Sequence, residues 1–177
     1  MRPWKRLFQE DSHESLDKFI YHATSPRSAI QILESGILKK SGSHEIGFDS
    51  YVWFYGSPSH HGNVQFMINQ NNLSDKELAD LLYNNMLESG EDEEAWVDTF
   101  ENYGFPNFLS YKDVYKMGRK TLLGVINDEA LFELLHNKDI PISRVDAVSI
   151  SREVGQEDRD KIESLAKKLN IKVIQEN

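Results

Sequence analysis

A short apolar run over residues 19–22 leads directly into a segment that carries the start and stop signals of a helix. Ser25 can serve as the N-cap, Pro26 suits the first helical position, and Gly36 stands just past the end. The apolar residues of this segment recur at the spacing of a helix face that packs on a core; they are Ala29, Ile30, Ile32, Leu33 and Ile37. We therefore expect a strand, a tight connection and an amphipathic helix.

Further strands and helices follow along the chain. The predicted strands are the apolar, aromatic or alternating segments 50–57, 63–68, 121–126, 144–151 and 171–175. The predicted helices are 74–90, 128–137 and 157–170, the first of which opens with a capping box of Ser74 and Glu77. Because these elements lack the regular βαβ alternation of a doubly wound sheet, the sequence predicts an α+β fold. Its sheets should be mixed and mainly antiparallel, with flanking helices.

An acidic stretch lies in the middle of the chain. Residues 88–101 hold seven acids and no Lys or Arg, yet Trp96, Val97 and Phe100 recur at helical spacing. This pattern indicates an acidic, partly docked helix, and we expect a helical insertion at about 74–113. The insertion would belong to a single domain over 19–177, preceded by an N-terminal arm over 1–18.

Composition and charge exclude several classes of protein. The absence of cysteine rules out a disulfide scaffold and thiolate metal sites. No apolar run approaches the ~20 residues of a membrane span, so we expect a cytoplasmic protein without membrane contact. The net charge of −9 argues against non-specific nucleic-acid binding. Three histidines, His44, His60 and His61, have no carboxylate at a helical spacing, which disfavours a metal site.

The residues "YHATSPRSAIQILESGIL" resemble the opening of the ADP-ribosyltransferase-like fold. In that family a strand ending in His-Gly-Thr/Ser precedes a helix and an "IL-x-x-G-(I/L)" exit. It includes poly(ADP-ribose) polymerase catalytic domains, DNA ADP-ribosyltransferase toxins and tRNA 2′-phosphotransferases. "YVWFYGSP" is similar to the family's next strand, and residues 121–151 are similar to its later half.

The resemblance implies that NAD is a substrate and that the first strand holds part of it. His22 would hydrogen-bond the nicotinamide-side ribose, and the backbone of Ala23, where glycine is usual, would hold the carboxamide. Thr24 lies on the same strand face as His22 and would brace its ring. The alternative for His22 is a strand-end histidine that hydrogen-bonds a nearby backbone group.

The resemblance also implies an aromatic side chain that stacks on the nicotinamide ring. Trp53 fits that position, Tyr51 and Tyr55 share its strand face as competitors, and each has the alternative role of a strand-face aromatic.

The reaction needs a group that stabilises an oxocarbenium-like ribosyl cation, in this family usually a glutamate near the start of a later strand. The residues at two predicted strand starts include no acid; they are Asn63, Gln65, Arg119, Lys120 and Thr121. Glu129 is therefore the catalytic candidate, with Glu101 as an alternative. Glu129 could equally be a structural acid at a helix N-terminus. Arg119 and Lys120 would suit phosphate groups or be solvated loop charges.

Two functions follow from these expectations. The first is an NAD-dependent ADP-ribosyltransferase that acts on a protein or nucleic-acid acceptor. The second is a catalytically inactive module of the same fold, which binds a nucleotide or uses its acidic insertion to contact a basic protein partner.

Overall fold

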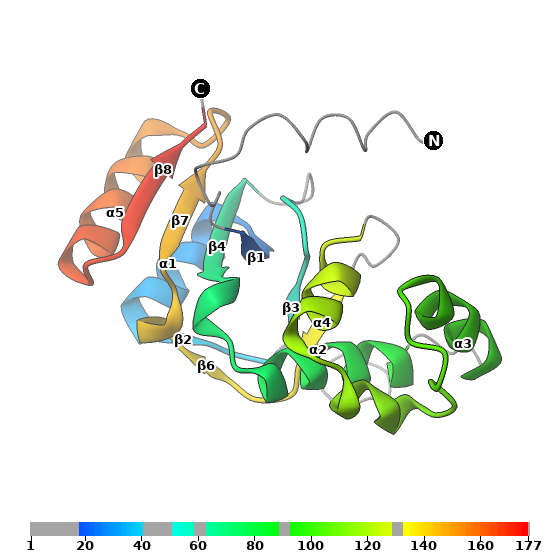
Figure 1. Ribbon diagram of the computed structural model, residues 1–177. Coiled ribbons are helices and arrows are strands. Elements are labelled where there is room, and N and C mark those ends of the chain that lie inside the picture. Colours follow the sequence, from blue (N-terminus) through cyan, green and yellow to red (C-terminus); the bar gives the residue numbers. More distant parts are fainter. Residues whose placement is uncertain (1–17, 41–50, 59–62, 89–92, 129–132, 177) are drawn as a thin grey trace.

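One large sheet and two small ones, with helices around them, form the α+β fold that the sequence predicts (Figure 1). The computed structural model describes residues 18–40, 51–58, 63–88, 93–128 and 133–176. The large sheet has the strand order β1 (Phe19–Thr24), β4 (Val64–Asn69), β7 (Ala147–Ile150) and β8 (Lys172–Gln175). The small sheets pair β2 (Ile37–Leu38) with β6 (Ile140–Pro141), and β3 (Val52–Phe54) with β5 (Leu134–His136). The pairings described are antiparallel apart from β7 with β8, as expected for mainly antiparallel sheets.

The helices lie beside the large sheet and beyond its far end. They are α1 (Pro26–Ser35), α2 (Asp75–Glu88), α3 (Glu93–Asn102), α4 (Arg119–Ile126) and α5 (Gln156–Lys168). Short 3₁₀ segments lie between other elements: η2 (Gln70–Asn72) before α2, η3 (Tyr111–Lys116) before α4, and η4 (Ile142–Arg144) before β7. Helix α1 packs against α5, and α2 packs against β5, η3 and α4. Figure 1 shows α3 at the opposite end of the molecule from α5 and β8.

The predicted helix signals of α1 are confirmed. The Ser25 hydroxyl accepts a hydrogen bond from the Ser28 N–H at 3.2 Å, and Pro26 opens the helix. Gly36 ends it in the left-handed conformation, with φ of 75°, which costs glycine little. The buried face includes Ala29 and Leu33. These local bonds fix the direction in which the chain leaves β1.

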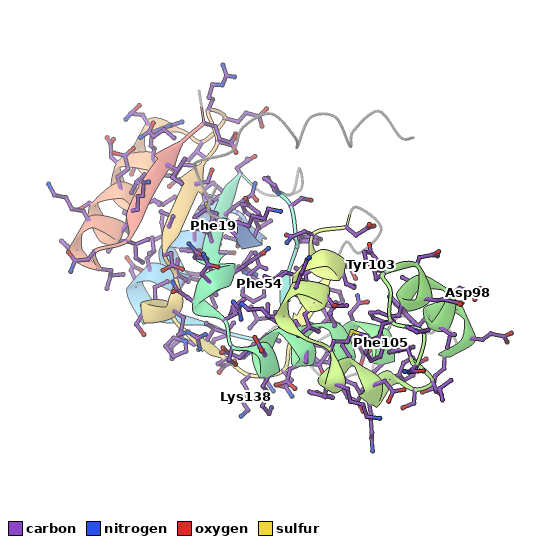
Figure 2. The ribbon with its side chains drawn as sticks, viewed as in Figure 1. Phe19, Phe54, Asp98, Tyr103, Phe105 and Lys138 are labelled. Carbon is purple, nitrogen blue, oxygen red and sulfur yellow. The ribbon has the colours of Figure 1, made fainter. Side chains whose placement is uncertain are left out.

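The capping box of α2 and the docked acidic helix are also confirmed. The Ser74 N–H donates to Glu77 Oε2 at 2.7 Å, and the Ser74 hydroxyl accepts from the Glu77 N–H at 3.1 Å. In α3, Trp96 and Phe100 are buried, while Asp98 points outward (Figure 2). Helix α3 is thus anchored by its aromatic residues and exposes its acids.

Two of the predicted elements are wrong. Residues 121–126, expected as a buried strand, belong to α4, which buries Leu122, Val125 and Ile126 on one face. Residues 134–136, expected within a helix over 128–137, form β5 instead. Helix α4 is amphipathic because its apolar residues recur at three- and four-residue spacing, which a strand could not place on one side.

Some predictions fall outside the described residues. They concern the arm over 1–17, the histidines at 44, 60 and 61, and Glu129. Among the residues that are described, no group of three or more metal-ligating side chains is close enough to hold an ion. No helix in the described part of the chain is long and apolar enough to cross a membrane.

Candidate functional site

The strands β1 and β3 meet at one point and then separate. Tyr21 and Tyr55 exchange two backbone hydrogen bonds, of 2.9 Å and 2.8 Å. One step further, the Trp53 carbonyl accepts a hydrogen bond from His22 Nδ1 at 2.8 Å. Within the described ranges no other backbone bond joins these two strands. A side-chain hydrogen bond therefore takes the place of the next pair of backbone hydrogen bonds. We call the unpaired stretch between the two strands, at His22, Ala23 and Trp53, the β1–β3 gap.

The hydrogen bond to Trp53 determines the tautomer of the His22 ring. A carbonyl oxygen can only accept, so Nδ1 carries the proton and Nε2 is the acceptor nitrogen of a neutral imidazole. Burial lowers the pKa of His22, and the bond to Trp53 opposes that shift only in part. The ring lies edge-on to Phe54, with centroids 5.8 Å apart, and stacks on Phe66 at 6.5 Å. Nε2 has no partner among the described residues.

The backbone of Ala23 faces the same gap. In an antiparallel ladder, successive residues direct their N–H and C=O groups to alternate sides. Tyr21 directs both groups to β3, so Ala23 does the same, while His22 bonds to Phe66 of β4. The Trp53 carbonyl opposite Ala23 is already occupied by His22. Ala23 thus presents a donor and an acceptor that β3 does not satisfy.

Three aromatic residues in and beside β3 share one face: Tyr51, Trp53 and Tyr55. Val52 and Phe54 point to the core, and Trp53 and Tyr55 on the opposite face are half-buried. Tyr51 on the same face is buried, and its hydroxyl donates to Glu88 Oε1 at 2.9 Å. Trp53 and Tyr55 are therefore the aromatic side chains of this face that remain partly accessible, and the His22 ring lies on the other face, against Phe54.

An acid that the sequence analysis missed lies beside Tyr55. The β3–β5 register pairs Trp53 with Leu135 and Phe54 with Leu134, so the next step places Glu133 opposite Tyr55. Burial, and secondarily the charge of Glu133, raise the pKa of the Tyr55 hydroxyl. This carboxylate directly precedes β5, as a glutamate at the start of a later strand would. The expected helix over 128–137 hid this arrangement.

Two contacts fix the strands around the gap. The Asn84 amide on α2 is buried and donates to the Leu135 carbonyl at 2.9 Å. A Cβ on Gly56 would lie only 2.3 Å from the Ile126 carbonyl oxygen, so the end of β3 lies against the end of α4. Only glycine permits this close approach.

The remaining sequence candidates have other surroundings. Thr24 follows His22 on the same face of β1, but the ring is hydrogen-bonded to Trp53 rather than to Thr24. Gln65 is buried opposite Ala23. Three candidates are exposed: Asn63, Glu101 and Lys120.

Arg119 is not the solvated loop charge that the sequence suggested. It opens α4 and donates from Nη2 to the Gln70 carbonyl at 2.7 Å. From Nη1 it donates to the Leu73 carbonyl at 2.8 Å and to Asp75 at 2.9 Å. Its bonds tie α4 to the segment between β4 and α2, which is a structural role.

No protein-family model matches the sequence, and no curated protein matches it significantly. Three solved structures of DarT from Thermus sp. 2.9 resemble the chain. The complex with NAD+ has 12% identity and a TM-score of 0.47 over 93% of this chain and 98% of that chain. The complex with ADP-ribosylated ssDNA has 12% identity and a TM-score of 0.46 over 90% and 94%. The complex with carba-NAD+ has 11% identity and a TM-score of 0.43 over 93% and 97%. Because all three TM-scores lie below 0.5, this likeness alone assigns neither a function nor a site.

Proposed function

We propose that the protein binds NAD in the gap between β1 and β3 and transfers ADP-ribose to a protein or nucleic-acid acceptor. The observation that carries this proposal is the separation of the two strands at His22 and Trp53. It leaves a neutral imidazole on the Phe54 face of the strands and an unpaired edge of peptide groups between them. The resemblance of the segment around His22 to ADP-ribosyltransferases supports the same function.

The first strand supplies groups that complement the nicotinamide riboside. A carboxamide has one acceptor and two donor hydrogens, and the N–H and C=O of Ala23 match it in kind. The Nε2 atom of His22 accepts a hydrogen bond from a ribose hydroxyl, because Nδ1 holds the ring proton. Trp53 or Tyr55 covers the face of the nicotinamide ring.

Glu133 supplies the acid that the transfer requires. The glycosidic C–N bond breaks, neutral nicotinamide leaves, and positive charge develops on the ribose, which a nearby carboxylate stabilises. The acceptor then forms a bond to the same carbon, and its proton passes to the carboxylate as general base. Glu133 takes this role in preference to Glu129 because its register places it beside Tyr55.

The second candidate function is a catalytically inactive module. Helix α3 exposes Glu94, Asp98 and Glu101 while its aromatic residues are buried. An exposed acidic face on an anchored helix would attract a basic protein partner. NAD binding without turnover would favour this function.

The test is NAD binding by calorimetry, with nicotinamide release followed in the same samples. The wild-type protein should bind and release nicotinamide, and His22→Ala should lose both. His136→Ala is the matched control, since His136 hydrogen-bonds the Lys138 backbone and lies outside the gap. Binding without release, with or without an acceptor, would favour the inactive module. No binding at millimolar NAD would overturn the proposal.

A further inference from the structure

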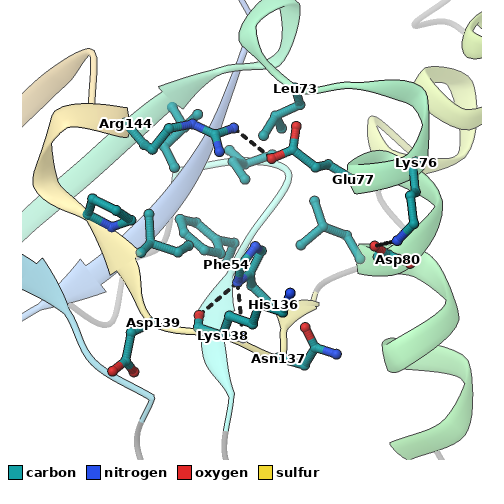
Figure 3. Close-up of a pocket in the computed structure, with 15 residues that line it drawn as sticks. Phe54, Leu73, Lys76, Glu77, Asp80, His136, Asn137, Lys138, Asp139 and Arg144 are labelled. Atoms are coloured by element: carbon teal, nitrogen blue, oxygen red, sulfur yellow. Dashed lines mark hydrogen bonds and ion pairs between the residues drawn. The ribbon is translucent and has the colours of Figure 1, made fainter.

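A cavity of about 320 Å³ lies between the start of α2, the connection from β5 to β6, and η4 (Figure 3). Its floor consists of buried apolar side chains: Ile20, Phe54, Ile68, Leu73, Leu81 and Ile140. None of the residues assigned to the β1–β3 gap lines it. The cavity is therefore distinct from the proposed NAD site.

Three carboxylates line the cavity. Asp139 accepts from the Lys40 N–H at 2.8 Å through Oδ1, and the other two, Glu77 and Asp80, are satisfied within the protein. Glu77 accepts from Arg144 Nη2 at 2.7 Å and from the Ser74 N–H at 2.7 Å. Asp80 accepts from Lys76 Nζ at 2.8 Å and from the Tyr115 hydroxyl at 2.6 Å. Both oxygens of Glu77 and Asp80 are thus engaged, and these two acids are poorly placed to take a cationic ligand.

Two cationic groups on the rim keep donors that the protein does not use, beside the polar side chains of His136, Asn137 and Asp139. Arg144 uses Nη2 for its described bonds, to Glu77 and to the Asn72 carbonyl, which leaves Nε and Nη1. The exposed Lys138 ammonium has no ion pair among the residues that the structure describes. Figure 3 shows Arg144 on one side of the cavity and residues 136–139 on the other, so these donors face a common space.

We infer that this cavity is a second ligand site, for a small molecule with an apolar ring system and an anionic group. The floor would remove the ring from water, and Arg144 and Lys138 would hold a carboxylate or a phosphate. The volume is at the lower end for small-molecule sites and suits one fused ring system. Aromatic carboxylates and nucleoside monophosphates share this chemistry.

One residue, Phe54, lies both at this cavity and next to His22. Phe54 forms part of the cavity floor, and its ring lies 5.8 Å from the His22 ring.

The test is a ¹H–¹⁵N NMR titration of the full chain with 2-naphthoate and, separately, with adenosine 5′-monophosphate. At least one should give saturable shifts of the amides over 76–81 and 136–144. The ligand that binds more tightly identifies the anionic group as carboxylate or phosphate. The neutral analogue, 2-naphthalenemethanol or adenosine, should bind about tenfold more weakly, since it lacks the charge-assisted bonds.

Charge reversal on the rim completes the test. Lys138→Glu should weaken binding of the anionic ligand at least about tenfold, and Lys172→Glu, an exposed control on β8, should not. Equal effects of the two variants would overturn the inference. So would the absence of saturable shifts with both ligands, or shifts confined to residues 22–24 and 53–55. NAD turnover is not measured, so the result is independent of the proposed function.

Discussion

Asn84 and Leu135 are joined by a hydrogen bond that ties the interior of α2 to the outer edge of β5. Leu135 in turn lies opposite Trp53, whose carbonyl accepts the bond from His22. On both outer edges of the β3–β5 pair, a side chain therefore hydrogen-bonds the backbone carbonyl: Asn84 on the β5 side and His22 on the β3 side. Glu133 stands two residues before Leu135, so the Asn84 bond fixes the strand that leads from the proposed acid.

Replacing Asn84 should cost stability. Asn84→Leu leaves the buried Leu135 carbonyl without its donor, and an unsatisfied buried polar group costs about 1–3 kcal/mol. Urea unfolding should show a loss of that size. Asn85→Leu is the matched control, because the side chain of the neighbouring asparagine has no hydrogen bond among those described. Equal losses in the two variants would contradict the importance of this bond.

Glu133→Gln should abolish turnover while the site still binds NAD. The amide keeps the size of the carboxylate but removes its charge and its basicity. We expect nicotinamide release to fall about 10²-fold or more, with NAD affinity changed only a few-fold. Glu129→Gln is the control, and it should retain activity. The reverse pattern would return the catalytic role to Glu129.

The same substitution should lower the pKa of Tyr55. Burial and the charge of Glu133 both raise that pKa above its ordinary value of 10.0, burial being the larger cause. Glu133→Gln should therefore bring the pKa down without returning it fully to 10.0. Ultraviolet titration of tyrosinate, with Tyr55→Phe to identify the signal, measures this shift. An unchanged pKa would place Glu133 away from Tyr55.

The helix boundaries were predictable because their signals are local. The Ser25 hydroxyl bonds to the N–H three residues along, and Ser74 and Glu77 cap each other over the same distance. Such bonds depend on a few consecutive residues, so the sequence pattern specifies them directly.

The errors arose where tertiary pairing decides the structure. Residues 121–126 are apolar enough for a strand, but burial of Leu122, Val125 and Ile126 against the rest of the core selects a helix. The described strand β5 has three residues, too few to show alternation, and its pairing with β3 lies some 80 residues away in the chain. The local sequence pattern could not reveal that pairing, although Glu133 directly before Leu134 and Leu135 was a signal of an acid at a strand start.

The candidate site, too, was predicted where its signals are local and missed where tertiary pairing decides. His22 was recognisable from the strand and helix that flank it, whereas its partner, the Trp53 carbonyl, is 31 residues away. Glu133 was missed because the strand it precedes was expected to be a helix. The sequence therefore indicated the first half of the site, and the β3–β5 register added the second.

Gly56→Ala should destabilise the protein. The added Cβ would meet the Ile126 carbonyl oxygen at 2.3 Å, and both sides of this contact are backbone, so one of them must shift. We expect a loss of about 1–3 kcal/mol in urea unfolding. Gly124→Ala is the control with the opposite sign. It lies in α4 with only a 4.0 Å neighbour, and alanine there should add about 0.5–1 kcal/mol.

The neutral state of His22 should make folding stability depend on pH. Its pKa is lowered in the folded protein, whereas in the unfolded chain it stays near 6.5. As the pH falls through 6.5, the unfolded chain takes up a proton that the folded protein does not, so the free energy of unfolding decreases. The decrease from this group stops once the pH is below the folded-state pKa.

His22→Gln isolates this effect, because glutamine can still donate to the Trp53 carbonyl but does not titrate. Urea unfolding of both proteins between pH 7.5 and pH 5 should show wild-type stability falling relative to the variant as the pH is lowered. A constant difference across that range would mean that the folded protein accepts the proton as readily as the unfolded chain. The ring would then be imidazolium at low pH with both nitrogens as donors, and Nε2 could not be the acceptor for a ribose hydroxyl there.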